Sequence, residues 1–178
     1  MLTPVEVTRT YLELSSPGQL KPAAAHDSSL RVERAVECPP ELYRRLYDEV
    51  GRAHHWRDRA DWSDAQIRAH LARPEISVWV LYRSDAPAGW FELVRHQDGS
   101  AEIAYFGLLP AFIGLGLGKH LLTVAAQEAW KMTSARVWLH TCTLDSPVAL
   151  PNYTARGFTA YREERYTVSL ERDDAGRA

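Results

Sequence analysis

Hydrophobic and polar positions follow two different periods along the chain, and the change between them predicts a mixed α/β protein. Short apolar or alternating runs predict strands. These are residues 5–14, 30–36, 76–82, 89–95, 101–109, 136–141 and 158–170. Helical spacing or start signals predict helices after Pro39, after Ser63, near 116–132 and around Pro147. The predicted order is β-β-α-α-β-β-β-α-β-α-β.

The dipeptide Asp98-Gly99 is the strongest hairpin signal in the chain. It lies between the predicted strands 89–95 and 101–109, which should therefore pair antiparallel. Antiparallel strands followed by a crossover helix and a further strand indicate an α/β or α+β mixed sheet flanked by helices. We expect the pairing direction in this sheet to change around the crossover.

Capping residues mark two of the helix starts. Ser63 and Gln66 form a capping box ahead of an apolar helical stripe. Asp145 or Ser146 should cap the last helix. Pro151 would then lie inside that helix and bend it, because proline removes one hydrogen bond from the helical ladder.

The chain is long enough for one domain with its own core, since it has 178 residues. Residues 1–29 read as an N-terminal extension that contains a strand and a turn-rich segment. Residues 30–170 hold all the other predicted elements and form the predicted domain. Residues 171–178 form a charged tail. The N-terminal strand is also free to pair with a second copy, so a homodimer is one hypothesis.

Composition excludes several classes of protein. The net charge is −2, from 21 Lys and Arg against 23 Asp and Glu, so there is no bulk positive charge to bind nucleic acid. Two cysteines are too few for a disulfide framework or a four-thiolate zinc site, and we expect no metal. The longest uncharged run, residues 103–118, is shorter than the roughly 20 residues that span a bilayer. The N-terminus lacks a signal-peptide pattern. We expect a cytoplasmic protein that binds neither nucleic acid nor membrane.

Three glycines, Gly114, Gly116 and Gly118, lie between the fifth predicted strand and the helix after it. Closely spaced glycines let the backbone approach a ligand, and a helix N-terminus offers free N–H groups to an anion, most often phosphate. A Walker A loop and a Rossmann fingerprint are both excluded, because Ile113 and Lys119 stand where those motifs require glycine. The alternative is a purely structural turn.

Two motifs of the chain resemble those of the GNAT acyltransferase superfamily. The first joins residues 101–110 to Gly114-x-Gly116-x-Gly118-Lys119 and resembles the family's acetyl-CoA-binding motif. The second is Ser146-Pro147-Val148-Ala149, followed by Tyr153 and Gly157-Phe158. The order of elements over residues 30–170 is also similar to the family fold. The resemblance implies a mostly antiparallel mixed sheet that splays at the cofactor site.

The activity that this resemblance implies is transfer of an acetyl group from acetyl-CoA to a primary amine of a small molecule or peptide. Two positions depart from the family pattern. Ile113 replaces the usual Gln or Arg, and Ser146 replaces the usual Asn. These departures keep a second hypothesis open, a CoA-binding regulatory module without turnover. A third hypothesis is an unrelated binding domain with a structural glycine loop.

Acetyl-CoA is expected to bind along the glycine loop and the helix that follows. The implied residues are Leu108, Leu109, Ile113, Gly114, Leu115, Gly116, Leu117, Gly118, Lys119, Ser146 and Tyr153. Lys119 fits this role, because bound phosphates would offset its unfavourable position at a helix start. The alternative is a side chain that points to solvent. A backbone N–H within residues 107–109 is expected to stabilise the oxyanion.

Tyr153 and Glu102 are the predicted catalytic residues. Tyr153 matches the family tyrosine that protonates the departing thiolate, although a buried aromatic anchor is the alternative. Glu102 heads an apolar strand, where desolvation raises a carboxyl pKa and suits a general base. The alternative is a solvated carboxylate beside the Asp98-Gly99 turn. Glu92 is a reserve base that is too far along the hairpin to pair with Glu102.

The loop 54–62 separates the first two predicted helices, a region that shapes the acceptor pocket in GNAT proteins. We predict that His55, Trp56, Trp62 and Glu92 contact the acceptor. Ordinary packing of the Trp rings is the alternative. His140 and Cys142 come at a strand end, so we expect them to line the cleft or the core.

Overall fold

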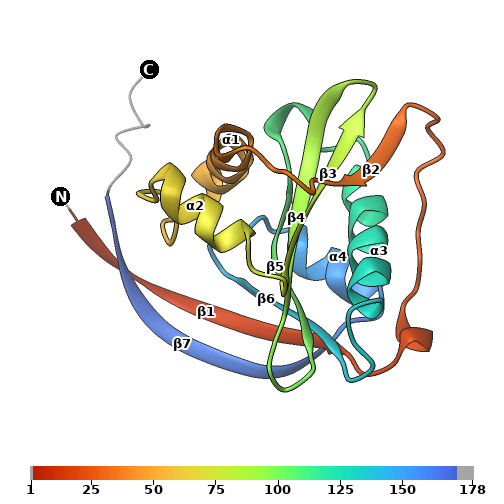
Figure 1. The fold of residues 1–178 in the computed structure, drawn as a ribbon. Coiled ribbons are helices and arrows are strands. Elements are labelled where there is room, and N and C mark those ends of the chain that lie inside the picture. Colours follow the sequence, from red (N-terminus) through yellow and green to blue (C-terminus); the bar gives the residue numbers. More distant parts are fainter. Residues whose placement is uncertain (1, 172–178) are drawn as a thin grey trace.

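The computed structural model describes residues 2–171 and shows a mixed α/β fold with one seven-stranded sheet (Figure 1). The strands are β1 (Leu2–Leu14), β2 (Leu30–Arg34), β3 (Ile76–Arg83), β4 (Ala86–Arg95), β5 (Ala101–Leu108), β6 (Val137–Cys142) and β7 (Thr159–Glu171). The helices are α1 (Pro40–Gly51), α2 (Asp64–Leu71), α3 (Leu117–Trp130) and α4 (Ala149–Ala155). The predicted order of strands and α-helices is confirmed.

The sheet has the order β2-β3-β4-β5-β6-β1-β7 and is mostly antiparallel. Strands β4 and β5 form the hairpin predicted from Asp98-Gly99. Gly99 has a φ of 82°, and the Asp98 carboxylate accepts a hydrogen bond from the Ser100 N–H at 2.9 Å. The pairing direction changes after the α3 crossover, because β5 and β6 are parallel. This change was expected from the element order.

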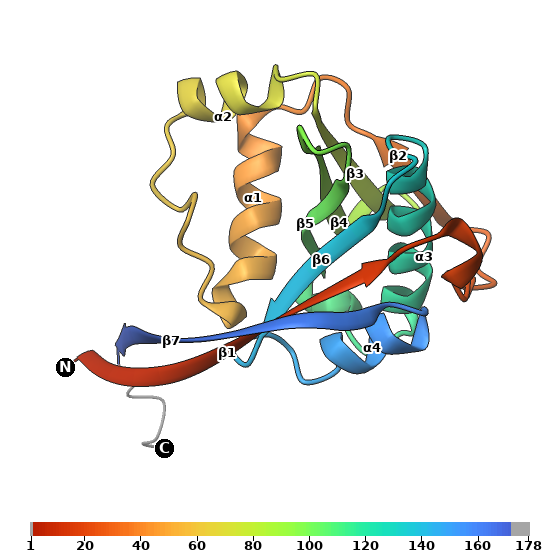
Figure 2. The same ribbon diagram turned by 90° about the horizontal axis from the view of Figure 1, so that it is seen from below.

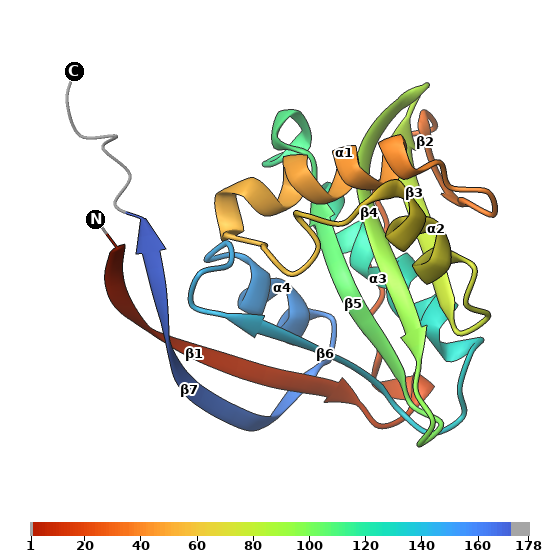
Figure 3. The same ribbon diagram turned by 60° about the vertical axis from the view of Figure 1, so that its left-hand side comes forward.

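Strands β5 and β6 pair over only two positions. Ala101 lies opposite Val137, and Glu102 lies opposite Trp138. Beyond Glu102 the two strands separate, and Figure 3 shows them diverging from a common end. The rest of β5 therefore has a hydrogen-bonding edge that β6 does not cover.

Strand β1 lies inside the sheet. It pairs with β6 over Arg9–Leu14 and with β7 along most of its length. Val7, Leu12 and Leu14 are buried, because this strand supplies part of the core. Leu2–Leu14 therefore form an integral strand of the sheet, whereas the sequence predicted that residues 1–29 are an extension outside the domain. Residues 2–8 pair with β7 alone and form a two-stranded arm (Figure 2).

Helices cover the two faces of the sheet unequally. On one face, α3 packs its apolar side chains, such as Leu121 and Leu122, on strands from both sides of the splay. On the other face, α1 and α2 pack on β3 and β4 through residues such as Leu46 and Ile67. This second cluster contains no residue of β6, β1 or β7. The α1/α2 face of those three strands is therefore left without a helix.

Helix α4 begins later than predicted. Val148 precedes its first residue, so neither Asp145 nor Ser146 caps it. The Asp145 carboxylate instead accepts hydrogen bonds from the Thr141 hydroxyl (2.6 Å) and the Cys142 N–H (2.9 Å), and it holds the turn after β6. Pro151 falls in the first turn of α4, where an N–H has no helical acceptor. The predicted bend at Pro151 was therefore wrong.

The segment between β1 and β2 is tied to the end of α4. Gly157 has a φ of 96°, and a Cβ at this position would overlap the carbonyl oxygen of Gln19. The Lys21 N–H donates a hydrogen bond to the Arg156 carbonyl at 2.9 Å. Only glycine allows this close approach. Within residues 2–171, no helix has the length and apolar composition needed to cross a bilayer.

Candidate active site

A cleft of about 810 Å³ opens where β5 and β6 separate. Its walls come from the loop between α1 and α2, from β5, from the glycine loop and from α4. Its floor includes residues of β6, β1 and β7. This volume lies in the range of cavities that bind cofactors and small substrates.

Most of the predicted site residues line this cleft. They are His55, Trp56, Glu102, Leu108, Ile113, Gly114, Gly116, Gly118, Lys119, Ser146 and Tyr153. Five others do not line it. Leu109 and Leu117 are buried, and Leu115 is exposed outside it. Trp62 packs edge-on against His70, with ring centroids 5.2 Å apart, and Glu92 is fully buried.

The glycine loop has a backbone conformation that side chains disfavour. Gly114 and Gly116 have φ values of 82° and 73°, in the left-handed region. A Cβ at Gly114 would meet no atom within 4 Å, so glycine is favoured here by the backbone conformation and not by lack of space. Gly116 directly precedes α3, whose first N–H groups lack helical partners. The loop therefore offers backbone donors to an anion in the cleft.

The open edge of β5 offers further backbone groups. The Leu109 N–H donates to the Ala88 carbonyl at 2.9 Å, on the β4 side. Successive residues of a strand direct their N–H groups to opposite edges, so the Leu108 N–H points to the side that faces the splay. Of the expected oxyanion donors, Leu109 is therefore already engaged and Leu108 faces the cleft.

Tyr153 lies in α4 and is 7% exposed. Its ring is edge-on to Phe106 and Phe158, with centroids 6.1 and 6.3 Å away. Burial, with a smaller contribution from the Asp145 charge, raises the pKa of its hydroxyl well above the usual value. Tyr153 is therefore both a packed aromatic and a protonated hydroxyl at the cleft.

Glu102 lies at the point where β5 leaves β6, between two histidines. Its Oε2 is 2.8 Å from His96 Nε2, and its Oε1 is 3.9 Å from His140 Nε2. Burial raises the pKa of Glu102, and the His96 hydrogen bond offsets this only in part. Burial, and then the Arg9 charge, lower the pKa of His140. The Glu102 side chain is 13% exposed, so it is not the solvated carboxylate of the alternative interpretation.

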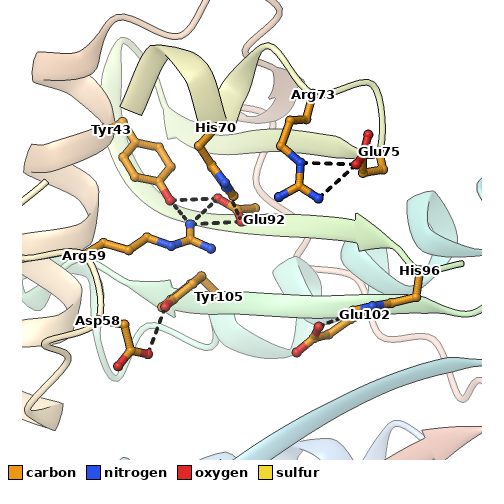
Figure 4. A network of polar contacts seen from close by, with 10 residues as sticks. All are labelled: Tyr43, Asp58, Arg59, His70, Arg73, Glu75, Glu92, His96, Glu102 and Tyr105. Carbon is orange, nitrogen blue, oxygen red and sulfur yellow. Dashed lines mark hydrogen bonds and ion pairs between the residues drawn. The ribbon is translucent and has the colours of Figure 1, made fainter. Parts of the chain in front are cut away.

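Glu92 belongs to a buried ionic network rather than to the cleft (Figure 4). Its carboxylate accepts hydrogen bonds from Arg59 at 2.8 and 3.0 Å and from the Tyr43 hydroxyl at 2.8 Å. His70 Nε2 lies 3.0 Å away. Residues of α1, α2 and the loop 54–62 bury Glu92, so it does not line the cleft, whereas the sequence predicted a contact with the acceptor.

Several contacts at the cleft join residues from different segments of the chain. Tyr105 donates a hydrogen bond to Asp58 at 3.3 Å, and its ring stacks parallel to that of Trp90. The Arg59 guanidinium lies 4.3 Å from the Tyr105 ring centroid. Arg9 reaches the cleft from β1. These contacts join distant segments, so no motif or period could reveal them.

A family model supplies the decisive comparison. The model described as the acetyltransferase (GNAT) family matches residues 40–158, which is more than half of the chain. The chain belongs to the GNAT acetyltransferase family. In this GNAT chain, the matched region begins with α1 and ends after α4, so β1, β2 and β7 lie outside it.

Solved structures share the GNAT fold at low sequence identity. A GCN5-related N-acetyltransferase from Kribbella flavida is 17% identical, with a TM-score of 0.65, over 94% of this chain and 59% of that one. An aminoglycoside acetyltransferase from an uncultured soil metagenomic sample is 18% identical, with a TM-score of 0.59, over 74% of this chain and 90% of that one. A tandem GNAT protein from the clavulanic acid biosynthesis pathway is 13% identical, with a TM-score of 0.60, over 95% and 55%.

This GNAT chain spans 52–62% of the length of three of the structures that it matches. No curated protein matches its sequence. The comparisons therefore establish the family and the fold, and they leave the acceptor to be argued from the cleft.

Proposed function

We propose that this protein transfers an acetyl group from acetyl-CoA to a primary amine of a small molecule or peptide. The observation that carries the proposal is the splay between β5 and β6. It brings the glycine loop, Tyr153 and Glu102 to one cleft. A phosphate-binding loop, a hydroxyl donor and a buried carboxylate are the groups that this reaction needs.

The residues at the cleft fit acetyl-CoA. The backbone N–H groups of Gly114 to Gly118, together with Lys119, would hold the phosphates. The open edge of β5 would pair with the amide groups of an extended arm, as a strand edge does. Ser146 lies beside this path. When bound, acetyl-CoA supplies an activated acetyl thioester.

Glu102 would remove the proton that keeps the acceptor amine unreactive. An amine with a pKa near 10.4 must lose a proton before it attacks, which is about 4.6 kcal/mol uphill at pH 7. A carboxylate in the cleft attracts the ammonium group and accepts that proton, directly or through water. His96 holds the carboxylate from one side, and His140 faces it from the other.

Two donors would stabilise the charge that develops during transfer. The Leu108 N–H faces the splay and would donate to the oxygen of the reacting carbonyl. The Tyr153 hydroxyl would donate to the departing sulfur. An ordinary tyrosine is already protonated at neutral pH, and burial raises the pKa of Tyr153 further, so this donor stays protonated.

The first test is a thermal shift with acetyl-CoA. A ligand at 100 times its Kd raises the free energy of unfolding by about 2.7 kcal/mol. We expect a raised Tm for the wild type and none for Gly116→Glu, whose carboxylate would occupy the anion site and repel phosphate. Gly99→Glu is the matched control, because Gly99 also has a positive φ and open space but lies in the β4–β5 turn.

Three results of this test lead to different conclusions. No shift in the wild type would contradict the cofactor assignment. A shift that Gly116→Glu retains would place acetyl-CoA elsewhere. A shift without turnover of any amine would support a CoA-binding regulatory module, the alternative function.

Tyr153→Phe tests the hydroxyl donor. We expect kcat to fall by about 10- to 100-fold, because a hydrogen bond to a charged group is worth roughly 1.5–3 kcal/mol. The acetyl-CoA thermal shift should stay as in the wild type, since the ring still packs on Phe106 and Phe158. Unchanged kcat would assign Tyr153 to packing alone.

A further inference from the structure

Arg9 is a cation in the cleft that no described acidic side chain neutralises. It projects from β1 and lines the cleft. Its Nη2 donates one long hydrogen bond, 3.3 Å, to the Tyr166 hydroxyl. Its Nε is buried and has no hydrogen-bond partner among the described residues. A guanidinium offers five donors, and among the described residues only the Tyr166 hydroxyl accepts a hydrogen bond from this one.

The acidic residue opposite Arg9 on the neighbouring strand already binds other groups. Glu164 lies opposite Arg9 in the β1–β7 ladder. Its Oε2 accepts a hydrogen bond from the Tyr11 hydroxyl at 2.8 Å, and its Oε1 pairs with Arg162. The carboxylate that the register would offer to Arg9 therefore binds other groups. An anion from outside the chain would satisfy the free donors.

Arg9 lies on the same face of the sheet as the Glu102 and His140 cluster. His140 is opposite Tyr11, and Cys142 is opposite Arg9. Alternate residues of a strand share a face, so Arg9 is one step of about 7 Å along β1 from the row that holds His140. Glu102 and His140 face the amine end of the acceptor site, and Arg9 lies beyond them toward the β1–β7 arm.

We propose that Arg9 binds a carboxylate of the acceptor, so that the substrate is an amino acid or another amine that carries a carboxylate. This inference rests on the proposed acetyl transfer. The planar guanidinium matches a carboxylate through two parallel hydrogen bonds. A single positive charge also balances one carboxylate, whereas a phosphate dianion would keep a negative charge. The Tyr166 hydroxyl positions the guanidinium.

Matched pairs of acids and amides test the proposal. The probes are glycine, β-alanine, γ-aminobutyrate and ε-aminocaproate, each with its carboxamide, compared at equal concentrations of neutral amine. Acetyl-CoA consumption gives kcat and KM. We expect the acid to be preferred by at least about 10-fold in kcat/KM at the chain length that spans the two ends of the site.

Arg9→Gln should remove this preference by raising the KM of the acid about 10- to 100-fold. Turnover of the amide and the acetyl-CoA thermal shift should not change. Arg57→Gln is the matched control, because Arg57 also lines the cleft but is exposed in the loop 54–62. Arg9→Lys keeps the charge without the planar fork, and it should recover only part of the preference.

The outcomes separate this inference from the proposed function. Turnover of amides and acids alike, or a preference that survives Arg9→Gln, overturns the role of Arg9 and leaves acetyl transfer intact. If Arg57→Gln loses the preference and Arg9→Gln keeps it, the substrate carboxylate binds another residue, and the role of Arg9 is again overturned. Absence of both an acetyl-CoA thermal shift and turnover overturns the proposed function and the substrate class together.

Discussion

Glu102→Gln is expected to lower kcat by about 10²- to 10⁴-fold, the usual contribution of a positioned general base. The amide has the same shape, and it can still hydrogen-bond to His96. It cannot accept the amine proton. The acetyl-CoA thermal shift and the Tm should therefore remain close to those of the wild type. Steady-state kinetics with an amine that the wild type acetylates measure kcat. Thermal unfolding of the same sample, with and without acetyl-CoA, measures the Tm and its shift.

The pH profile identifies the ionising group. Burial raises the pKa of Glu102. As the pH falls, the carboxylate that activity needs is therefore protonated at a higher pH than an ordinary glutamate would be. The kcat/KM of the wild type should therefore fall as the pH drops through this raised pKa. This acid limb should be missing in Glu102→Gln.

An exposed glutamate provides the control. Glu33→Gln, in β2, removes a carboxylate outside the cleft and should leave kcat and its acid limb unchanged. If Glu102→Gln retains more than about a third of the wild-type kcat, the proposed base is wrong. His140, on the opposite side of the carboxylate, would then be the next residue to substitute.

Glu92→Ala is expected to lower the free energy of unfolding by about 3–5 kcal/mol, because it leaves a buried charge without its partner. Glu92 has no exposed surface, and it holds Arg59, His70 and Tyr43 together (Figure 4). Without Glu92, the Arg59 guanidinium would remain buried among aromatic rings with no carboxylate to pair with. Urea denaturation, with the midpoint and the slope compared with the wild type, measures the loss.

Glu75→Ala is a neighbouring control. Glu75 pairs with Arg73 at 2.9 Å just after the same helix (Figure 4), and both side chains are partly exposed, 31% and 53%. Exposed pairs contribute little. A similar loss in both variants would contradict a special contribution of the buried network.

The pH dependence of stability has a definite sign. Desolvation raises the pKa of Glu92, but hydrogen bonds from His70 and Arg59 outweigh it and hold the pKa below the ordinary value. The network therefore stabilises the fold above the ordinary glutamate pKa, and this contribution is lost as the pH falls through the lowered pKa. Glu92→Ala should lack this part of the acid sensitivity.

The same network reaches the cleft, because Arg59 and Tyr105 line it. Arg59 links Glu92 to the aromatic rings of Tyr105 and Trp62. Adjacent to it, Asp58 accepts a hydrogen bond from Tyr105. The sequence predicted that residues of this loop bind the acceptor directly. In the structure, Glu92 contacts this loop through Arg59 from the buried side.

Interactions between neighbouring residues explain which parts of the structure could be predicted. The Asp98-Gly99 turn and the Ser63–Gln66 capping box involve neighbouring residues, and both form as predicted. The strand and helix periods depend on which face is buried, and they predicted the order of elements. The glycine loop was recognisable because positive φ values at Gly114 and Gly116 restrict the residue type.

The way in which these elements meet depends on packing between distant segments. No local pattern places β1 between β6 and β7, since strand order depends on pairing between segments more than a hundred residues apart. The short contact of β5 with β6, the burial of Glu92 and the unneutralised charge of Arg9 follow from that packing. Burial and charge balance depend on every element around a side chain. Local patterns were therefore sufficient to predict the elements and the glycine loop, whereas the packing of distant segments sets the shape and charge of the cleft.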